Sequence, residues 1–175
     1  KMANQEKEYL KRAFPNSAEY KISLYAVFMD KAIQLSKPTG GLQTFIVPDS
    51  FLLGRYFSRI RKYILEVDEI VYILLLPYSV FEATVGYSVV YLFQRKQKIN
   101  EKHKLIAKFA ENNDVVRKGD FIELSYQQDY FQNLKFNRFR LFFDEVVLKV
   151  ISKIENNSEE LNNAIRFSSG LISKT

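Results

Sequence analysis

The stretch from Leu24 to Gly54 constrains the fold most, because it contains a helix, a turn, a strand and a polar loop in direct succession. Apolar residues recur with the helical period of about 3.6 and cover more than half of the helix circumference. They form two stripes, which are Leu24, Phe28, Ala32 and Leu35, and Tyr25, Met29 and Ile33. Such a helix is expected to pack on a sheet. Lys37, Pro38 and the glycine pair 40–41 should end it.

The next segment predicts a strand that leads into a polar loop. Residues 44–47 are an apolar run without alternation, which favours a strand covered on both faces, and Pro48 should end it. Asp49 and Ser50 follow directly. In open α/β sheets ligands bind at the carboxyl ends of the strands, so these two residues are candidates for a site. Loop caps are the more common role for such side chains.

The pattern continues as a helix and two strands. Residues 55–66 predict a surface helix, whose basic face would be Arg55, Arg59, Arg61 and Lys62. Residues 70–76 predict a buried strand, and residues 86–93 an alternating one. Residues 77–84 between them are too many for a tight turn and include Phe81 beside polar groups, as in loops that line sites.

The second half of the chain is less regular. Residues 94–102 are rich in lysine and arginine and poor in apolar residues, so we place a soft boundary there. Residues 105–109 predict a strand, residues 112–114 a turn, and Asp144 the start of a helix. Aromatic residues alternate with cations in residues 121–143, which fits a nucleic-acid surface or, as the favoured interpretation, a core with a solvated rim.

These residues carry a family resemblance. The order of helix, Lys-Pro-x-Gly-Gly at residues 37–41, Ile-Val-Pro at 46–48 and Ser-Phe-Leu at 50–52 resembles adenine-specific DNA methyltransferases, including the fused type II restriction-methylation enzymes. Thr39 makes the turn one residue longer than is usual in that family. The likeness continues through the helix and strands up to residue 95, and is fainter over residues 143–171.

The resemblance implies an α/β fold: the second half of a Rossmann-like methyltransferase sheet, in the order helix, strand, helix, strand and antiparallel strand, followed by a mixed α+β extension. Residues 1–95 would be the C-terminal half of the catalytic domain. Residues 96–175 would be a linker and the start of a DNA target-recognition region.

Two motifs of such enzymes do not occur in the chain. It has neither a Gly-x-Gly loop for S-adenosylmethionine nor the catalytic Asn-Pro-Pro-Tyr, and the resemblance places both upstream of Lys1. We therefore expect a fragment of a larger restriction-modification enzyme that contains no catalytic residue. Its expected partners are the missing N-terminal half of the catalytic domain and double-stranded DNA. By itself it should neither bind S-adenosylmethionine nor methylate DNA.

The resemblance also implies substrate-binding residues. Phe81 would stack on the adenine flipped from the duplex, with Asp49 and Ser50 near the same pocket. Without the resemblance, Phe81 could equally be a core anchor. The candidates for DNA contact are Arg55, Arg59, Arg138 and Arg140. A solvated face is the more common role for any one of these charges.

Composition narrows the remaining possibilities. The net charge of +6 favours a polyanionic partner, and the absence of cysteine excludes disulfides and zinc-thiolate sites. A single histidine leaves little room for a metal site, and no apolar run is long enough to cross a membrane, so we expect a cytoplasmic protein. One alternative function is a non-catalytic DNA-recognition or subunit-docking module. Another is the same methyltransferase fold acting on RNA or on a protein glutamine.

Overall fold

The computed structural model describes residues 2–81, 86–98, 100, 102–159 and 161–165. It divides into two compact units, residues 1–141 and residues 142–175, which are described separately. Among the helices of the described residues, none combines the length and the apolar character that crossing a membrane requires. The faint family likeness at residues 167–171 lies outside the described residues.

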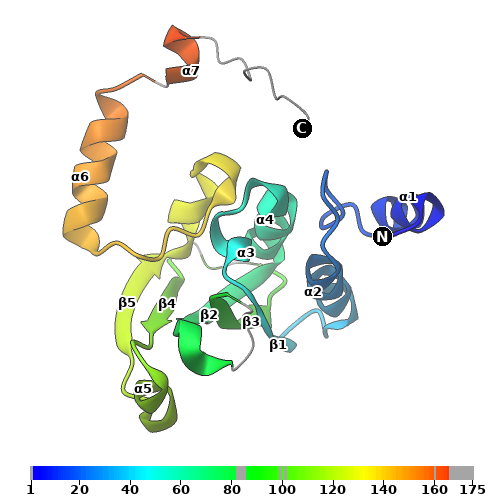
Figure 1. The fold of residues 1–175 in the computed structure, drawn as a ribbon, viewed down its shortest axis with the longest axis horizontal. Coiled ribbons are helices and arrows are strands. Elements are labelled where there is room, and N and C mark those ends of the chain that lie inside the picture. Colours follow the sequence, from blue (N-terminus) through cyan, green and yellow to red (C-terminus); the bar gives the residue numbers. More distant parts are fainter. Residues whose placement is uncertain (1, 82–85, 99, 101, 160, 166–175) are drawn as a thin grey trace, which may run out of the picture. The chain divides into compact units, whose positions relative to one another are not determined.

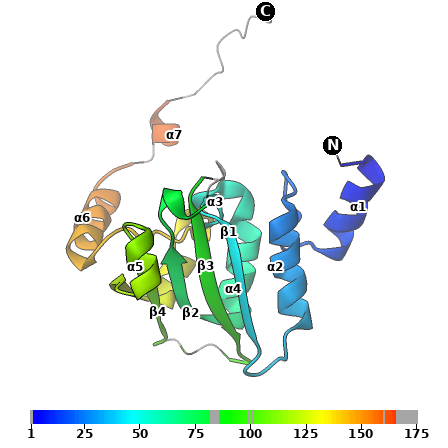
Figure 2. The same ribbon diagram turned by 60° about the horizontal axis from the view of Figure 1, so that its bottom comes forward.

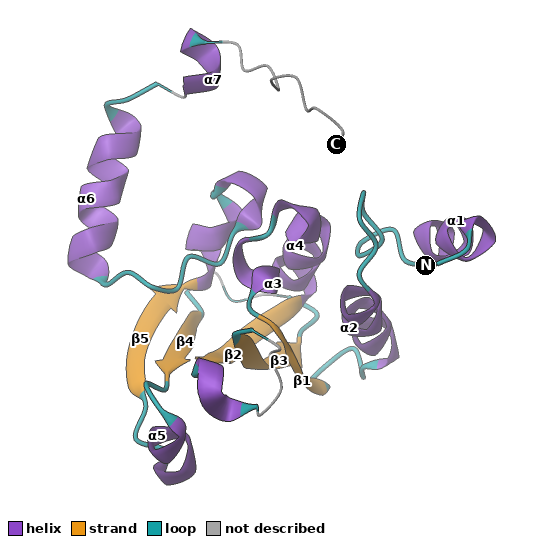
Figure 3. Ribbon diagram, in the orientation of Figure 1, coloured by secondary structure: helices purple, strands orange, loops and turns teal. Residues whose placement is uncertain are grey.

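The first unit is built on a mixed sheet of five strands (Figures 1 and 3). Its spatial order is β1 (Leu42–Pro48), β3 (Ser88–Arg95), β2 (Asp68–Leu75), β4 (Lys104–Phe109) and β5 (Ile122–Gln127). Strand β3 runs antiparallel to both β1 and β2, β2 is parallel to β4, and β4 is antiparallel to β5. The predicted order of helix, strand, helix, strand and antiparallel strand is thereby confirmed.

In the part of this unit that the structure describes, five helices accompany the sheet: α1 (Asn4–Ala13), α2 (Leu24–Leu35), α3 (Ser50–Leu53), α4 (Ser58–Val67) and α5 (Asn113–Lys118). Short 3₁₀ turns lie in the connections: η1 (Arg55–Phe57), η2 (Tyr78–Val80), η3 (Gln128–Gln132) and η4 (Lys135–Asn137). Helix α2 begins and ends as predicted. Helix α5 replaces the predicted turn, because the Asn112 side chain accepts hydrogen bonds from the Asp114 and Val115 amides and so caps a helix.

The core lies between one face of the sheet and helices α2, α3 and α4 (Figure 2). Tyr91 and Phe93 on β3 stack with 3.9 Å between ring centroids. Phe51 of α3 meets Tyr91 at 6.3 Å and the edge of Phe139 at 5.7 Å. These rings are fully buried, so a chain of aromatic contacts joins the sheet, α3 and the segment after η4.

The prediction that β1 is covered on both faces is wrong. In the described part of the chain β1 pairs with β3 alone, so its other edge is free. Its residues alternate: Val47 faces the core, whereas Leu42 and Ile46 are 60% and 50% exposed. One stripe of α2, Leu24, Phe28 and Leu35, is exposed as well, so this helix buries only part of its apolar surface.

The soft boundary at residues 94–102 falls between two strands of the same sheet. Strand β4 lies beyond it and pairs with β2, and the first compact unit extends to Leu141. The assignment of residues 96–175 to a linker and a recognition region stays a prediction.

The second unit contains α6 (Glu145–Asn156) and α7 (Leu161–Ala164). Asp144 starts α6 as predicted, since its carboxylate accepts a 2.8 Å hydrogen bond from the Val147 amide. Helix α6 is amphipathic. Its exposed apolar residues are Val146, Val147, Val150 and Ile154.

Candidate functional site

The polar loop after β1 and the loop between β2 and β3 lie at the same edge of the sheet. The Asp49 amide donates a 3.1 Å hydrogen bond to the Tyr87 carbonyl, and the Leu76 amide donates a 2.9 Å bond to the Ser88 carbonyl. The ends of β1 and β2 therefore both meet the start of β3. Asp49 therefore lies next to the end of the β2–β3 loop. A site at this edge of the sheet requires that these two loops lie close together.

Asp49 and Ser50 have different surroundings. The Ser50 hydroxyl lies 3.3 Å from the Tyr25 hydroxyl, which connects α3 to α2. Burial raises the pKa of the Tyr25 phenol, so this group is a neutral hydrogen-bonding partner. Asp49 precedes α3 with helical backbone angles, and its side chain does not cap the helix. The Asp49 carboxylate therefore does not have the loop-capping or helix-capping role that is common for such side chains.

Phe81 lies at the surface. It directly follows η2 and is 40% exposed, so it is not an anchor of the core. The rings of Tyr78 and Tyr87 meet edge to face at 5.5 Å where the loop begins and ends. Residues 82–85 lie outside the described residues. Stacking of Phe81 on a flipped base stays a prediction.

Arg61 was predicted on an exposed basic face, and this is wrong. The side chain is fully buried and donates to four carbonyl oxygens. The distances are 2.6 Å to Phe51, 2.9 Å to Gly54, 2.8 Å to Phe136 and 2.9 Å to Asn137. Burial lowers the pKa of Arg61 to about 10, so the group stays charged at neutral pH. A guanidinium can satisfy this many acceptors because its donors form a planar fork.

Three of the four predicted DNA-contact arginines come together beside α4. The Arg138 and Arg55 guanidinium carbons lie 5.3 and 5.9 Å from the centre of the Phe136 ring. Arg55, Phe136 and Arg59 line one hollow, in which the Arg59 Nε lies 3.7 Å from the Glu19 carboxylate. The fourth arginine, Arg140, is half-buried.

Some aromatic residues at positions 121–143 fit the interpretation as a core, and others fit the interpretation as a nucleic-acid surface. Tyr126, Phe131 and Phe139 are buried in the core, whereas Phe136 and Phe142 are 36% and 48% exposed. Nothing in the local pattern marks Phe136 as different. Its position depends on Arg61, a residue 75 positions earlier in the chain.

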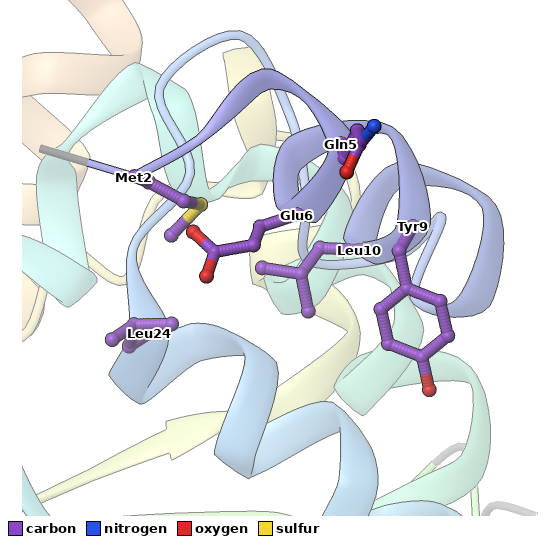
Figure 4. A pocket seen from close by; sticks show the side chains of 6 residues that line it. All are labelled: Met2, Gln5, Glu6, Tyr9, Leu10 and Leu24. Carbon is purple, nitrogen blue, oxygen red and sulfur yellow. The ribbon is translucent and has the colours of Figure 1, made fainter.

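A second hollow, of about 700 Å³, lies at the N-terminal end of the chain (Figure 4). It is largely apolar and is lined by Met2, Gln5, Glu6, Tyr9, Leu10 and Leu24. None of the predicted site residues belongs to it.

A buried carboxylate lies at the start of β2, and sequence reasoning missed it. Asp68 is 1% exposed, accepts a 3.0 Å hydrogen bond from Gln43 and lies 3.7 Å from Arg95. Burial raises the pKa of Asp68 to about 6, against the opposing effect of Arg95. Asp68 is at the opposite end of β2 from the β2–β3 loop, so it belongs to the fold and not to the candidate site.

Comparison with known families decides what this fold is. Residues 1–81 match the family model of the Eco57I restriction-modification methylase. The matched range is slightly less than half of the chain. The match includes α1 to α4, β1, β2 and the loop residue Phe81. The resemblance inferred from the sequence is thus confirmed over this range.

Two solved structures, those of BpuSI and DrdV, share this fold. The type IIG restriction endonuclease BpuSI is 16% identical with a TM-score of 0.58, over 85% of this chain and 19% of that protein. DrdV, solved as a complex with DNA, is 16% identical with a TM-score of 0.53, over 83% and 16%. The M protein of the type I restriction enzyme EcoKI is 24% identical with a TM-score of 0.43, over 50% and 19%. The chain thus spans about a fifth of the length of these proteins. Comparison with curated proteins gives no match.

Proposed function

We propose that the chain is part of a site-specific DNA methyltransferase of a restriction-modification system, which transfers a methyl group from S-adenosylmethionine to the exocyclic amine of adenine. The observation that carries this proposal is the family match over residues 1–81. The BpuSI and DrdV folds agree with it. In this proposal the target is double-stranded DNA, and residues 96–175 begin the region that recognises the sequence.

Phe81 is the residue of this chain proposed to touch the substrate. An aromatic face holds a flipped base by stacking and leaves the amine edge of the base free to react. The exposure of the ring at the edge where β1 and β2 end supports this role. Asp49 and Ser50, at the same edge, would line the rim of the pocket.

The rest of the catalytic domain would dock on the free edge of β1. The Asp49 amide donates to the Tyr87 carbonyl, and the Arg95 amide donates to the Gly41 carbonyl. Because pairing alternates along an antiparallel ladder, the backbone groups of Leu42, Thr44 and Ile46 point toward the free edge of β1. An unpaired edge beside exposed apolar side chains is a surface that a strand and a helix can cover. In this proposal the cofactor-binding half supplies both, together with the S-adenosylmethionine site.

The test is methyl transfer by the longer enzyme that contains this chain. The enzyme is incubated with labelled S-adenosylmethionine and duplex DNA, and the DNA is digested to nucleosides that are identified by mass spectrometry. The proposal expects label in N6-methyladenine. Label in methylcytosine would overturn the adenine specificity, and label in RNA or protein with none in DNA would overturn the substrate class.

A second candidate function has one observation in its favour. The exposed apolar residues of α6, Val146, Val147, Val150 and Ile154, form a stripe suited to packing against another helix. This favours a non-catalytic role in subunit docking. An enzyme that methylates DNA normally after Val150→Lys and Ile154→Lys, but no longer assembles with its partner subunit, would place docking in this helix.

A further inference from the structure

Phe136 is a half-exposed aromatic ring surrounded by positive charge. The Arg138 and Arg55 guanidinium carbons and the Lys135 ammonium lie 5.3, 5.9 and 5.9 Å from its centre. All three distances are within the range of cation–π attraction. The ring nevertheless remains 36% exposed, so these cations leave part of it open to solvent.

The backbone holds this ring in a conformation that a phenylalanine rarely adopts. The φ angles of Phe136 and Asn137 are +61° and +50°, which is the left-handed region. This conformation has an energetic cost for residues other than glycine. Arg61 counteracts this cost, since its guanidinium donates to the carbonyl oxygens of both residues. Strain that is held in this way at an exposed ring points to a binding role.

A pair of stacked rings lines the same hollow as Phe136. Tyr20 and Tyr56 stack with 5.8 Å between centroids and 21° between planes, and Arg55 also lies 5.8 Å from the Tyr56 ring. Tyr20 is 89% exposed. Together with Phe136 these rings line a hollow of about 480 Å³. This volume is in the range of pockets that hold small organic groups.

The charge of this hollow is unbalanced. Glu19 is the carboxylate among its described lining residues, and it is already engaged. It accepts 2.9 and 3.3 Å hydrogen bonds from the Ser58 hydroxyl and the Arg59 amide. Among the residues that the structure describes, no carboxylate lies within ion-pair distance of Arg55 or Arg138. Arg55 in the hollow and Arg138 beside the Phe136 ring can thus bind an anion next to exposed π faces.

We propose that this cluster of Tyr20, Tyr56, Phe136, Arg55 and Arg138 binds one unpaired nucleotide of DNA. A base has a π face that stacks on Phe136 or Tyr56, and its phosphates suit Arg55 and Arg138. The assignment rests on the proposed function only in taking DNA as the partner, and it is a different contact from that of Phe81. It gives the longer enzyme a place for a base displaced from the duplex outside the methylation pocket.

The test is titration of the 175-residue chain against two labelled duplexes, followed by fluorescence anisotropy. One duplex carries a single unpaired adenosine, and the other carries an abasic residue at the same place. The proposal expects the chain to bind the first duplex more tightly. Phe136→Leu should weaken binding to that duplex by about five- to a hundredfold, as loss of a stacking ring does, and should leave the abasic duplex unaffected. Phe136→Tyr should retain the preference.

The arginines are tested separately, because phosphates are present in both duplexes. Arg55→Ala with Arg138→Ala should weaken both complexes, and should lower the slope of log affinity against log salt by about 1 to 2. The controls are Tyr9→Leu and Arg117→Ala, which remove an exposed ring and an exposed arginine elsewhere. If circular dichroism shows that Phe136→Leu is unfolded, Tyr56→Leu replaces it.

Equal affinity of the wild-type chain for the two duplexes would overturn the proposal, as would a preference that both ring variants retain. These results would not affect the proposed methyl transfer, which is measured on the longer enzyme by its nucleoside product. Conversely, an enzyme that methylates no DNA would overturn the proposed function and leave this binding result standing.

Discussion

The buried guanidinium of Arg61 donates a 2.8 Å hydrogen bond to the carbonyl oxygen of Phe136, 75 residues further along the chain. The same group bonds to the carbonyl oxygens of Phe51 and Gly54, in and after α3. One side chain of α4 therefore fixes both the segment that follows β1 and the turn that presents Phe136. The positions of the candidate site residues depend on a residue that is itself inaccessible.

Replacement of Arg61 should destabilise the fold strongly. In Arg61→Met the carbonyl oxygens that the guanidinium now satisfies stay buried without a donor, at roughly 1 to 3 kcal/mol each where water cannot enter. We expect a loss of at least about 3 kcal/mol in the free energy of unfolding, measured by urea denaturation. Arg61→Lys should lose less, because an ammonium has three donors for four acceptors.

Arg59→Met on the same helix is the matched control. Arg59 is 63% exposed and pairs with Glu19 at 3.7 Å, so its removal should change stability by less than about 1 kcal/mol. Similar losses for Arg61→Met and Arg59→Met would show that the buried hydrogen bonds do not organise this region.

The buried carboxyl of Asp68 should make stability depend on pH. Its pKa is about 6 in the folded protein and 3.8 in the unfolded chain, so the folded state binds the proton more tightly. Protonation therefore stabilises the fold, and this contribution is complete below pH 3.8 and is lost as the pH rises through 6. The difference in pKa corresponds to about 3 kcal/mol.

Asp68→Asn isolates this contribution from those of other carboxylates. Urea unfolding of both proteins should show that wild-type stability, relative to the variant, falls by about 2 kcal/mol between pH 4 and pH 7. A difference that rises with pH would mean that the ion pair with Arg95 outweighs burial and that the pKa of Asp68 is lowered.

The free edge of β1 should make the isolated chain associate with itself. Sedimentation velocity at rising protein concentration should show oligomers, because an unpaired apolar edge is a template for another strand. Leu42→Lys with Ile46→Lys should give a monomer with little loss of stability, since both side chains are at least half exposed. Leu53→Lys, at an exposed apolar position of α3, is the control. A wild-type chain that is monomeric throughout would contradict this expectation.

The sequence alone was sufficient to predict the elements whose signals are local. The apolar period and the Lys-Pro-Thr-Gly-Gly turn place α2 and its end, and Asp144 places the start of α6. The resemblance added the antiparallel orientation of β3, which periodicity does not contain. These features depend on residues close together in the chain or on a known family pattern.

What could not be predicted depends on contacts between distant residues. Arg61 has the spacing of a surface cation, and only its four carbonyl partners, two of them in η4, explain its burial. The apolar run of β1 indicates two covered faces, but its exposure depends on which strands are present beside it. Phe136 and Phe139 have similar neighbours in the sequence, yet one lies at the surface and the other in the core.

We propose that Phe81 of this chain forms an aromatic wall of the adenine pocket of a DNA methyltransferase. The most direct measurement is the methylation rate of the longer enzyme carrying Phe81→Ala, with its melting curve recorded beside it. Loss of stacking, at roughly 1 to 3 kcal/mol, should lower methylation efficiency about ten- to a hundredfold. The melting temperature should change little because the ring is 40% exposed, and Phe81→Trp should retain much of the activity. A folded Phe81→Ala enzyme that methylates adenine at the wild-type rate would contradict the claim.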